Sequence, residues 1–341
     1  MIGNPSEREA WRGISIQQRQ RYIANELVIS HPDFVLAVRE IARMARRSRN
    51  ERKGNAILVI AGSGQGKSFL AGYLLRLYPR IDVGEASKVP AMAFSIPSAV
   101  TPRLMGVAAL SALGDPKANS GDSETVKARL LGLMAATGVE IVLIDNVQDI
   151  PERRHEGGIK HIGNWIRDLI DSAKVLVVLL GTPAALAVTN LNSQLRRRAV
   201  KQLFIRRFSI DTKVAFARFL RLLDELDKRL PMAEPSALCA PELAQRLYYA
   251  TYGVMDYLLA LVSEAVECAV AERRERLLRE DFACAFDRLF RDSAKDLNPF
   301  SSDGPQRALD QRGEPFHRWF DSSNPEFPVS AGPPAASHES R

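Results

Sequence analysis

The chain has 341 residues, enough for one large domain and a smaller one, and its hydrophobic content of 46% is ordinary for a globular protein. No apolar run approaches the ~20 residues that span a bilayer, and the N-terminus lacks the apolar core of a signal peptide, so we expect a cytoplasmic protein without a membrane partner. The net charge of +7 suggests a polyanionic partner, first of all nucleic acid, although a merely basic protein fits this charge equally well.

The first 53 residues are predicted to form an N-terminal helical extension, because their apolar residues recur at helical spacing. This extension ends in a basic run over residues 46–53 that leads into the first predicted strand. The run is either a solvated helix end or a surface for phosphates.

Five short apolar runs alternate with helical stretches between residues 54 and 210. The runs are Ala56–Ile60, Ala91–Ile96, Ile141–Ile144, Val175–Leu180 and Gln202–Ile205. Continuous apolar runs are typical of strands that are covered on both faces. Their alternation with helices predicts the α/β class, with a five-stranded parallel sheet between helices.

A glycine-rich turn follows the first predicted strand, and residues 61–68 read Ala-Gly-Ser-Gly-Gln-Gly-Lys-Ser. Glycines let consecutive backbone N–H groups point at a polyphosphate, and the helix that starts behind them adds its positive dipole end. Lys67 can reach the β- and γ-phosphates and Ser68 can ligate Mg²⁺, so this loop predicts ATP and Mg²⁺ as ligands. The predicted phosphate-binding residues are Gly62, Ser63, Gly64, Gln65, Gly66, Lys67, Ser68 and Phe69. The first glycine of the motif is replaced by Ala61, a small residue that still fits.

The third apolar run ends in Asp145, a carboxylate carried to the edge of the sheet where it can hold a Mg²⁺-bound water. Together with the upstream loop, this pattern predicts a P-loop NTPase. In AAA+ ATPases an acidic residue usually follows and polarises the attacking water, but here the next residue is Asn146. An amide can orient a water but cannot act as a base. Asp149 is near in sequence, and it would serve only if the backbone returned it to the γ-phosphate.

Two further positions resemble AAA+ functional sites. Thr182 follows the fourth apolar run, where AAA+ proteins place the polar sensor 1 residue, and it also suits the N-cap of a helix that starts at Pro183. The segment 193–201 contains Arg196, Arg197 and Arg198 in the region of the AAA+ arginine finger, which stabilises phosphoryl charge in a neighbouring subunit. A solvated basic helix end or a DNA-facing patch remains the alternative.

The character of the chain changes after Asp211. Apolar residues lie on one face of a helix that Asp211 or Thr212 can cap, and further helices are expected near 241–251, 254–273 and 279–291. Residues 211–292 are therefore predicted to form an all-helical lid. Residues 293–341 are rich in Pro, Ser, Gly and charge and are expected to be largely disordered, with docking motifs or chance aromatics near 298–300 and 315–320.

The three cysteines, Cys239, Cys268 and Cys284, are widely spaced and form no metal-ligand pattern. We expect buried thiols in a reducing compartment.

With these residues in view, the chain resembles the TniB/TnsC family of AAA+ transposition ATPases, related more distantly to MuB, over about residues 7 to 300. The resemblance rests on the phosphate loop and on several shorter sequence motifs. These motifs are Glu7-Arg8-Glu9-Ala10-Trp11, His31-Pro32, Leu143-Ile144-Asp145, Gly181-Thr182, and Gln194-Leu195 with Arg198. The family pattern makes Arg198 the finger, although Ala199 replaces the usual Phe. In Gly253-Val254-Met255-Asp256, no Arg or Lys stands where many AAA+ proteins carry a sensor 2 arginine, which this family commonly lacks.

The resemblance implies an ATP-dependent regulator that assembles as a ring or helical filament on double-stranded target DNA and recruits a DDE transposase, often with a TniQ-type adaptor. Phosphate contacts without strong sequence preference would hold the DNA. The candidate contacts are Arg103, after the second strand, and Arg153, Arg154 and Lys160, after the third, although a solvated loop charge explains each of them at least as well. Alternatives are a helicase loader of the IstB or DnaC type, a nucleotide-binding scaffold with negligible turnover, and a small-molecule kinase, against which the helical lid, Thr182 and Arg198 argue.

Overall fold

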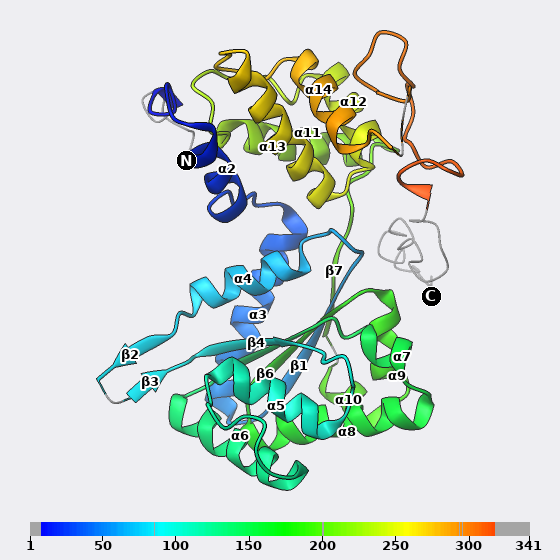
Figure 1. Cartoon of the computed structure of the whole chain (residues 1–341). Coiled ribbons are helices and arrows are strands. Elements are labelled where there is room, and N and C mark those ends of the chain that lie inside the picture. Colours follow the sequence, from blue (N-terminus) through cyan, green and yellow to red (C-terminus); the bar gives the residue numbers. More distant parts are fainter. Residues whose placement is uncertain (1–7, 85, 200, 293, 295, 318–341) are drawn as a thin grey trace, which may run out of the picture.

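The computed structural model describes residues 8–84, 86–199, 201–292, 294 and 296–317. The polypeptide forms two parts, a sheet with helices on both faces and a helical part above it (Figure 1). Within the described residues, no helix is long and apolar enough to cross a membrane.

The central sheet has five parallel strands in the order β4-β5-β6-β1-β7. The strands are β1 (Asn55–Ala61), β4 (Ala91–Ser95), β5 (Ile141–Asp145), β6 (Leu176–Gly181) and β7 (Lys201–Ile205). A two-stranded antiparallel hairpin, β2 (Ile81–Val83) with β3 (Ala86–Lys88), projects to one side of it (Figure 1). The prediction of a five-stranded parallel sheet is confirmed, and each strand lies within a residue or two of its apolar run.

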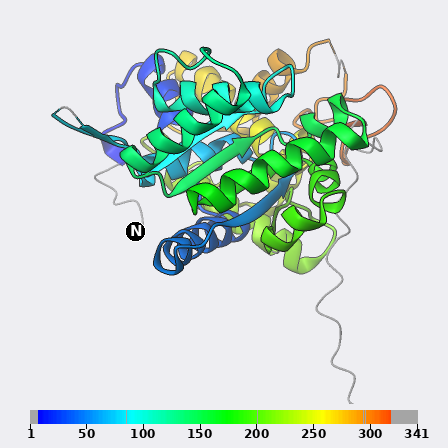
Figure 2. The same cartoon turned by 90° about the horizontal axis from the view of Figure 1, so that it is seen from below.

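Side chains alternate between the two faces of the sheet and enter two different cores. Leu58 and Val142 lie in the core under α5 (Pro102–Leu113), α6 (Ser123–Thr137) and α8 (Glu156–Ala173). Ile57 and Leu143 lie in the core under α3 (Pro32–Glu51) and α4 (Lys67–Leu77). The view from below shows the sheet between these two helical layers (Figure 2). Strands covered on both faces need apolar residues at every position, which explains the continuous runs.

Short elements complete the sheet domain at its carboxyl edge and beside β7. They are α7 (Asp149–Arg153), the 3₁₀ turn η1 (Pro183–Ala185), α9 (Leu186–Asn190) and α10 (Ser193–Arg198).

The helical part contains the predicted lid helices. They are α11 (Lys213–Lys228), α12 (Pro241–Thr251), α13 (Met255–Ala271) and α14 (Arg279–Leu289). Thr212, rather than Asp211, caps α11, because its side chain accepts a hydrogen bond from the backbone N–H of Ala215 at 3.1 Å.

The N-terminal helices divide between the two parts. Helix α2 (Ile16–Asn25) packs against α13, and Ile23, Leu27 and Ile29 lie in the core of the helical part. Helix α3 instead packs on the sheet, where Ile41 is fully buried. Residues 26–31 therefore cross from the lid to the sheet, and this crossing matters for the site.

The prediction that the tail from residue 293 has no packed core was wrong for residues 296–317. Phe300, Leu309 and Phe316 are buried among the lid helices, and the Phe316 ring stacks on Tyr252 with 5.9 Å between ring centroids. Composition misled because three buried apolar side chains anchor a segment otherwise rich in Pro, Ser and Gly. The part of the expected docking motif at residues 318–320 lies outside the described residues.

The cysteine expectation also needs a correction. A disulfide joins Cys268 of α13 to Cys284 of α14, and only Cys239 is a free thiol, half-buried. The sequence could not indicate this pair, because antiparallel packing of two helices brings the two residues together.

Candidate nucleotide site

The phosphate loop has the backbone conformation that its glycines allow. Gly64 and Gly66 have φ values of +68° and +86°, in the left-handed region where a side chain is strained. Gly66 is also the N-cap of α4, so the loop turns directly into the N-terminus of that helix. The first helical N–H groups therefore face the loop and form an anion-binding end.

Lys67 is buried and held in place by its own loop. Its Nζ donates to the carbonyl oxygens of Ala61 at 3.0 Å and Gly62 at 2.8 Å. An ammonium group has three N–H donors, so one remains for a phosphate oxygen. Burial lowers the pKa of Lys67, while the carboxylates of Asp145 and Asp256 act in the opposite direction. The buried ammonium group of Lys67, beside an anion-binding loop, can therefore interact strongly with phosphate.

The two residues predicted to hold Mg²⁺ meet in the structure. The Ser68 hydroxyl donates to Asp145 Oδ2 at 3.0 Å, across 77 residues of sequence. The other oxygen of Asp145 accepts from the backbone N–H of Asn146 at 2.8 Å. A hydroxyl and a carboxylate are hard oxygen ligands, which is the donor set that Mg²⁺ prefers. The residues present therefore fit this ion.

Asn146 has a special backbone and a fixed side chain. Its φ of +58° lies in the left-handed region, which Asn tolerates better than most residues. Gln148 Nε2 donates to its amide oxygen at 3.2 Å. The Asn146 NH₂ group is then the end that remains for another partner, and this group is a donor. Gln148 Oε1 accepts from the backbone N–H of Thr182 at 3.2 Å, so one carboxamide links the ends of β5 and β6.

Sequence reasoning missed Gln148. The clue was an amide two residues after the predicted catalytic position, but only the fold shows that it faces the next strand. The packing is tight there, since a Cβ built on Gly181 would lie 3.2 Å from Gln148 Oε1. Asp149 has both carboxylate oxygens engaged, one by Gln148 at 3.3 Å and one by Arg153 at 2.7 Å.

Thr182 does not act as the side-chain cap of the turn that follows it. Its hydroxyl makes no cap hydrogen bond to η1, and Oγ1 is buried without a partner among the described residues. An unpaired buried hydroxyl costs about 1–3 kcal/mol. Thr182 thus stands at the predicted N-cap position before Pro183, but its hydroxyl makes no cap hydrogen bond and remains available to a ligand.

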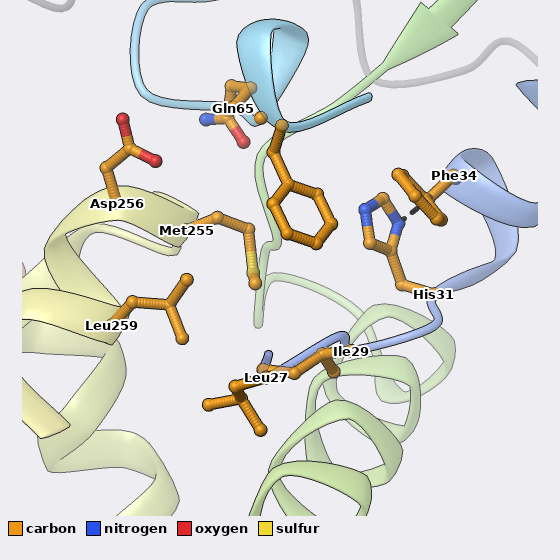
Figure 3. A pocket seen from close by; sticks show the side chains of 10 residues that line it. Leu27, Ile29, His31, Phe34, Gln65, Met255, Asp256 and Leu259 are labelled. Atoms are coloured by element: carbon orange, nitrogen blue, oxygen red, sulfur yellow. Dashed lines mark hydrogen bonds between the residues drawn. The ribbon is translucent and has the colours of Figure 1, made fainter. Parts of the chain in front are cut away.

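A cavity of about 90 Å³ lies beside the loop, between three segments that are distant in sequence (Figure 3). Its lining residues are Leu27, Ile29, His31, Phe34, Gln65, Gly66, Phe69, Met255, Asp256 and Leu259. The lining is mostly apolar and aromatic, and the space is several times that needed for a water. Such a pocket beside an anion site suits a flat heterocycle attached to a phosphate chain. Phe69, predicted as cofactor-binding, lines it.

Polar groups at this cavity are few. His31 Nδ1 accepts from the backbone N–H of Phe34 at 3.4 Å and caps α3, and burial lowers the pKa of His31. Gln65 is 2% exposed, and neither its amide oxygen nor its nitrogen has a partner among the described residues. The sequence had assigned Gln65 to the phosphates only through the motif.

The candidate finger residues lie away from this chain's own phosphate loop. Arg198, at the end of α10, forms an ion pair with Asp171 of α8 at 2.8 Å, with about a third of its side chain exposed. Arg196 and Arg197 are exposed on the same short helix. All three precede the amino end of β7, whereas the phosphate loop follows the carboxyl end of the neighbouring parallel strand β1.

The four candidate DNA contacts differ in their surroundings. Arg103 donates to Asn119 and Gly121, Arg153 to the carbonyls of Pro97 and Ser98, and Arg154 to the Val100 carbonyl. These guanidinium groups therefore hold surface loops together. Lys160 is exposed on α8, and within the described part of the chain no hydrogen bond or ion pair engages its ammonium group.

Comparison with known proteins places this site in context. No curated protein sequence matches the chain. Among solved structures, the ORC1 protein of Aeropyrum pernix in complex with DNA is similar with a TM-score of 0.56 and 18% identity, over 80% of this chain and 70% of that one. The ORC2 protein of Aeropyrum pernix, in ADPNP–ADP complexes, gives a TM-score of 0.57 and 13% identity, over 80% and 72%. At these identities the similarity shows the AAA+ fold alone.

The family comparison goes further. The model of the bacterial TniB protein family matches residues 19–209, more than half of the chain, and these residues contain the phosphate loop, Asp145, Thr182 and Arg198. The chain therefore belongs to the TniB family and is an AAA+ ATPase.

Proposed function

We propose that this protein binds ATP with Mg²⁺, assembles on double-stranded DNA in the ATP state, and there recruits or activates a DDE transposase, with a TniQ-type adaptor as a further partner. One observation carries the proposal. In a chain of the TniB family, Lys67 Nζ is hydrogen-bonded to the carbonyl oxygens of Ala61 and Gly62, and the Ser68 hydroxyl is hydrogen-bonded to Asp145. Preorganised donors bind phosphate without reorganisation at the moment of binding.

In the proposed site, the base of ATP occupies the cavity between the lid and the loop, and the loop N–H groups and Lys67 hold the phosphates. Ser68 and Asp145 hold Mg²⁺, which neutralises phosphate charge when bound. Thr182 offers its unpaired hydroxyl to the γ-phosphate as sensor 1. Asn146 presents a donor, not a base, so it can orient a water but cannot take its proton.

Asn146 and the two engaged oxygens of Asp149 favour slow intrinsic hydrolysis. A long-lived ATP state suits a protein that must remain on DNA until a partner arrives. A second candidate function, a nucleotide-binding scaffold with negligible turnover, rests on the same residues. Measured turnover with DNA and a transposase separates the two, because the regulator is stimulated and the scaffold is not.

Completion of the site by a neighbour is the reason to expect an oligomer. Arg198 is paired with Asp171 of α8 and not with its own phosphate loop, and a ring or filament would bring it to the loop of the next subunit. The Asp171 pair would orient the guanidinium until that interface forms. Related folds act on DNA, as the ORC1 complex illustrates, and the net charge of +7 suits a phosphate backbone.

The test is electron microscopy with duplex DNA, with and without a non-hydrolysable ATP analogue, together with binding measured at two salt concentrations. We expect rings or filaments only with the analogue, and weaker binding at the higher salt. Lys67→Ala is the control that should form none. Assembly that ignores nucleotide, or DNA affinity that ignores salt, would contradict the proposal.

The choice of DNA-contact variants follows from the surroundings of each residue. Lys160→Ala removes a charge with no described partner, so a loss of DNA affinity reports a phosphate contact. Substituting Arg103, Arg153 or Arg154 would also loosen the loops that they hold. These three variants therefore need a stability measurement beside the DNA measurement.

A further inference from the structure

The first turn of the lid helix α13 touches the phosphate loop. The backbone N–H of Asp256 donates to the Gly64 carbonyl at 3.0 Å. A Cβ built on Gly64 would lie 3.0 Å from Val254 Cγ1 and 3.4 Å from Asp256 Oδ2. The carboxylate of Asp256 is therefore beside the loop that binds phosphate, at the edge of the cavity (Figure 3).

Lys67 lies in the field of two carboxylates, Asp145 from the sheet and Asp256 from the lid. Burial raises the pKa of Asp256, and Lys67 is the charged group, among those described, that lowers it. The two acids differ in what else compensates them. Asp145 accepts hydrogen bonds from Ser68 and from the Asn146 backbone, and it is the proposed partner of Mg²⁺. The charge of Asp256 is compensated by Lys67, and Lys67 is also the residue that would bind the phosphate.

A triphosphate that enters the loop brings several negative charges toward this carboxylate. Like charges a few ångströms apart near a protein surface repel strongly enough to change an equilibrium constant by tenfold or more. Two responses relieve the repulsion, weaker retention of the nucleotide or movement of the first turn of α13 away from Gly64. While phosphate is bound, the repulsion therefore disfavours the contact between the first turn of α13 and the phosphate loop.

We propose that Asp256 is a negative determinant of polyphosphate affinity: its carboxylate opposes nucleotide phosphates, so that the docked lid which forms the cavity also disfavours phosphates in the loop. This inference rests on the proposed nucleotide site. It gives the lid a role opposite to that of a lid which grips its nucleotide with a cation. Nucleotide release then becomes a step that the lid promotes.

The matched comparison uses two acids that each lie in the first turn of a lid helix. Asp256→Asn removes the charge beside the loop and keeps the backbone N–H that contacts Gly64. Glu242→Gln removes an exposed acid from the first turn of α12, so it reproduces any effect on a helix dipole. Asp256→Ser is a second variant with a good helix-start residue, in case the amide alters packing.

Calorimetry or fluorescence titration then measures the affinity for ATP, ADP and adenosine in the presence of Mg²⁺. We expect Asp256→Asn and Asp256→Ser to bind ATP about 3- to 30-fold more tightly, ADP less so, and adenosine unchanged, because only phosphates feel the charge. Glu242→Gln should match the parent for all three ligands. Added salt should reduce the difference between Asp256→Asn and the parent.

Three outcomes would overturn the inference. Weaker ATP binding by Asp256→Asn would mean that the carboxylate supports the loop through Lys67. Equal tightening for adenosine would mean a change of cavity shape, and unchanged ATP affinity would mean that the charge is screened. Failure of the nucleotide site itself has a different signature, since the parent and Lys67→Ala would then bind ATP equally poorly.

Discussion

The two halves of the nucleotide site are built in different ways. The phosphate half is polar: Lys67 makes two hydrogen bonds to its own loop, and Ser68 is bonded to Asp145. The proposed base half is a mostly apolar cavity whose walls come from residues 27–34, 65–69 and 255–259, and the Gln65 amide that lines it has no hydrogen-bond partner among the described residues. The first half exists within the sheet domain alone, whereas the second exists only while the lid and the N-terminal crossing are docked.

This difference predicts a division of labour. The phosphate half should set whether phosphate and metal are bound at all, because its contacts are charged and directional. The base half should report the position of the lid, because its contacts are mostly apolar and are shared among segments of the lid, the loop and the N-terminal crossing. Four predictions test the division.

The largest effect is expected for Arg198, which we propose completes the phosphate half of the site in a neighbouring subunit. Arg198→Ala should keep nucleotide affinity but reduce ATP turnover by about 10³-fold or more, since arginine fingers contribute about 10³ to 10⁵. Turnover and nucleotide affinity are measured separately. A mixture with Lys67→Ala should recover part of the activity, because one intact interface forms between the two variants.

Normal turnover by Arg198→Ala alone would exclude Arg198 as the arginine finger, and Arg196 or Arg197 would then be the candidates. Asp171→Asn is the accompanying control. It frees Arg198 from its ion pair without removing the guanidinium. If the pair only orients the finger, this variant should retain most of the turnover.

The next effect concerns Asn146. Adding a carboxylate should raise hydrolysis by roughly 10²-fold, because general-base assistance contributes about 10² to 10⁴. Asn146→Glu supplies the reach, and Asn146→Asp is the companion variant that tolerates the φ of +58° better. ATP affinity should change little, and DNA-bound assemblies should have shorter lifetimes in single-turnover assays.

The opposite pattern would identify a different base. If the parent turns over ATP quickly, if both Asn146 variants change little, and if Asp149→Ala abolishes hydrolysis, then the slow-switch interpretation fails.

Gln148→Leu tests whether the Gln148 carboxamide positions Asn146, because leucine removes its hydrogen bonds but keeps a side chain of similar size. It should alter turnover while leaving ATP affinity near the parent value, because Gln148 touches Asn146 and the Thr182 backbone but not the loop.

A paired experiment compares the two halves directly. Lys67→Ala should weaken ATP about 10- to 100-fold, because a charge-assisted hydrogen bond contributes roughly 1.5–3 kcal/mol, and it should leave adenosine unaffected. Leu259→Ala should weaken ATP and adenosine by the same factor, about fivefold, through lost apolar contact. A loss of ATP binding in Leu259→Ala with adenosine intact would show that the cavity does not hold the base.

The smallest effect is a pH dependence in the base half. Burial lowers the pKa of His31, so the unfolded chain binds the proton more readily than the folded one. The stability contribution of neutral His31 is therefore complete above its unfolded pKa, about 6.5, and declines as the pH falls through that value toward the lower folded pKa. Urea unfolding at several pH values between 7.5 and 5 should show this slope.

His31→Asn is the control variant for the slope. Asn is a good N-cap and does not titrate in this range, so the slope should flatten. Lost ring contacts with Phe34 and Phe208 lower the absolute stability, which is why the slope, not the midpoint, is compared. An unchanged slope in this variant would place the titrating group elsewhere.

Most of the sheet and of the phosphate half could be predicted from the sequence. The strands were visible because a strand covered on both faces must be apolar at every position, as Ile57 and Leu58 illustrate on opposite faces of β1. The loop was visible because its chemistry lies in eight consecutive residues. Asp145 could be paired with Ser68 because parallel strands and the loop share one edge of the sheet.

Other features were hidden for a physical reason. The cavity joins Leu27 to Leu259, and the tail packs Phe316 on Tyr252, so these contacts depend on how separate helices dock. Composition gave a wrong expectation for the tail, since a few buried side chains outweigh many polar ones. The Cys268–Cys284 pair depends in the same way on the packing of α13 against α14.

The sequence by itself therefore determined the α/β class, the phosphate loop and the family, because each is encoded by local patterns: apolar runs, glycines at fixed spacing and short motifs. Only the tertiary structure decided that Gln148 links Asn146 to Thr182, that a cavity lies between the lid and the phosphate loop, and that Asp256 touches Gly64. Those contacts join segments as distant in sequence as Leu27 and Leu259, and no local pattern specifies the docking that creates them.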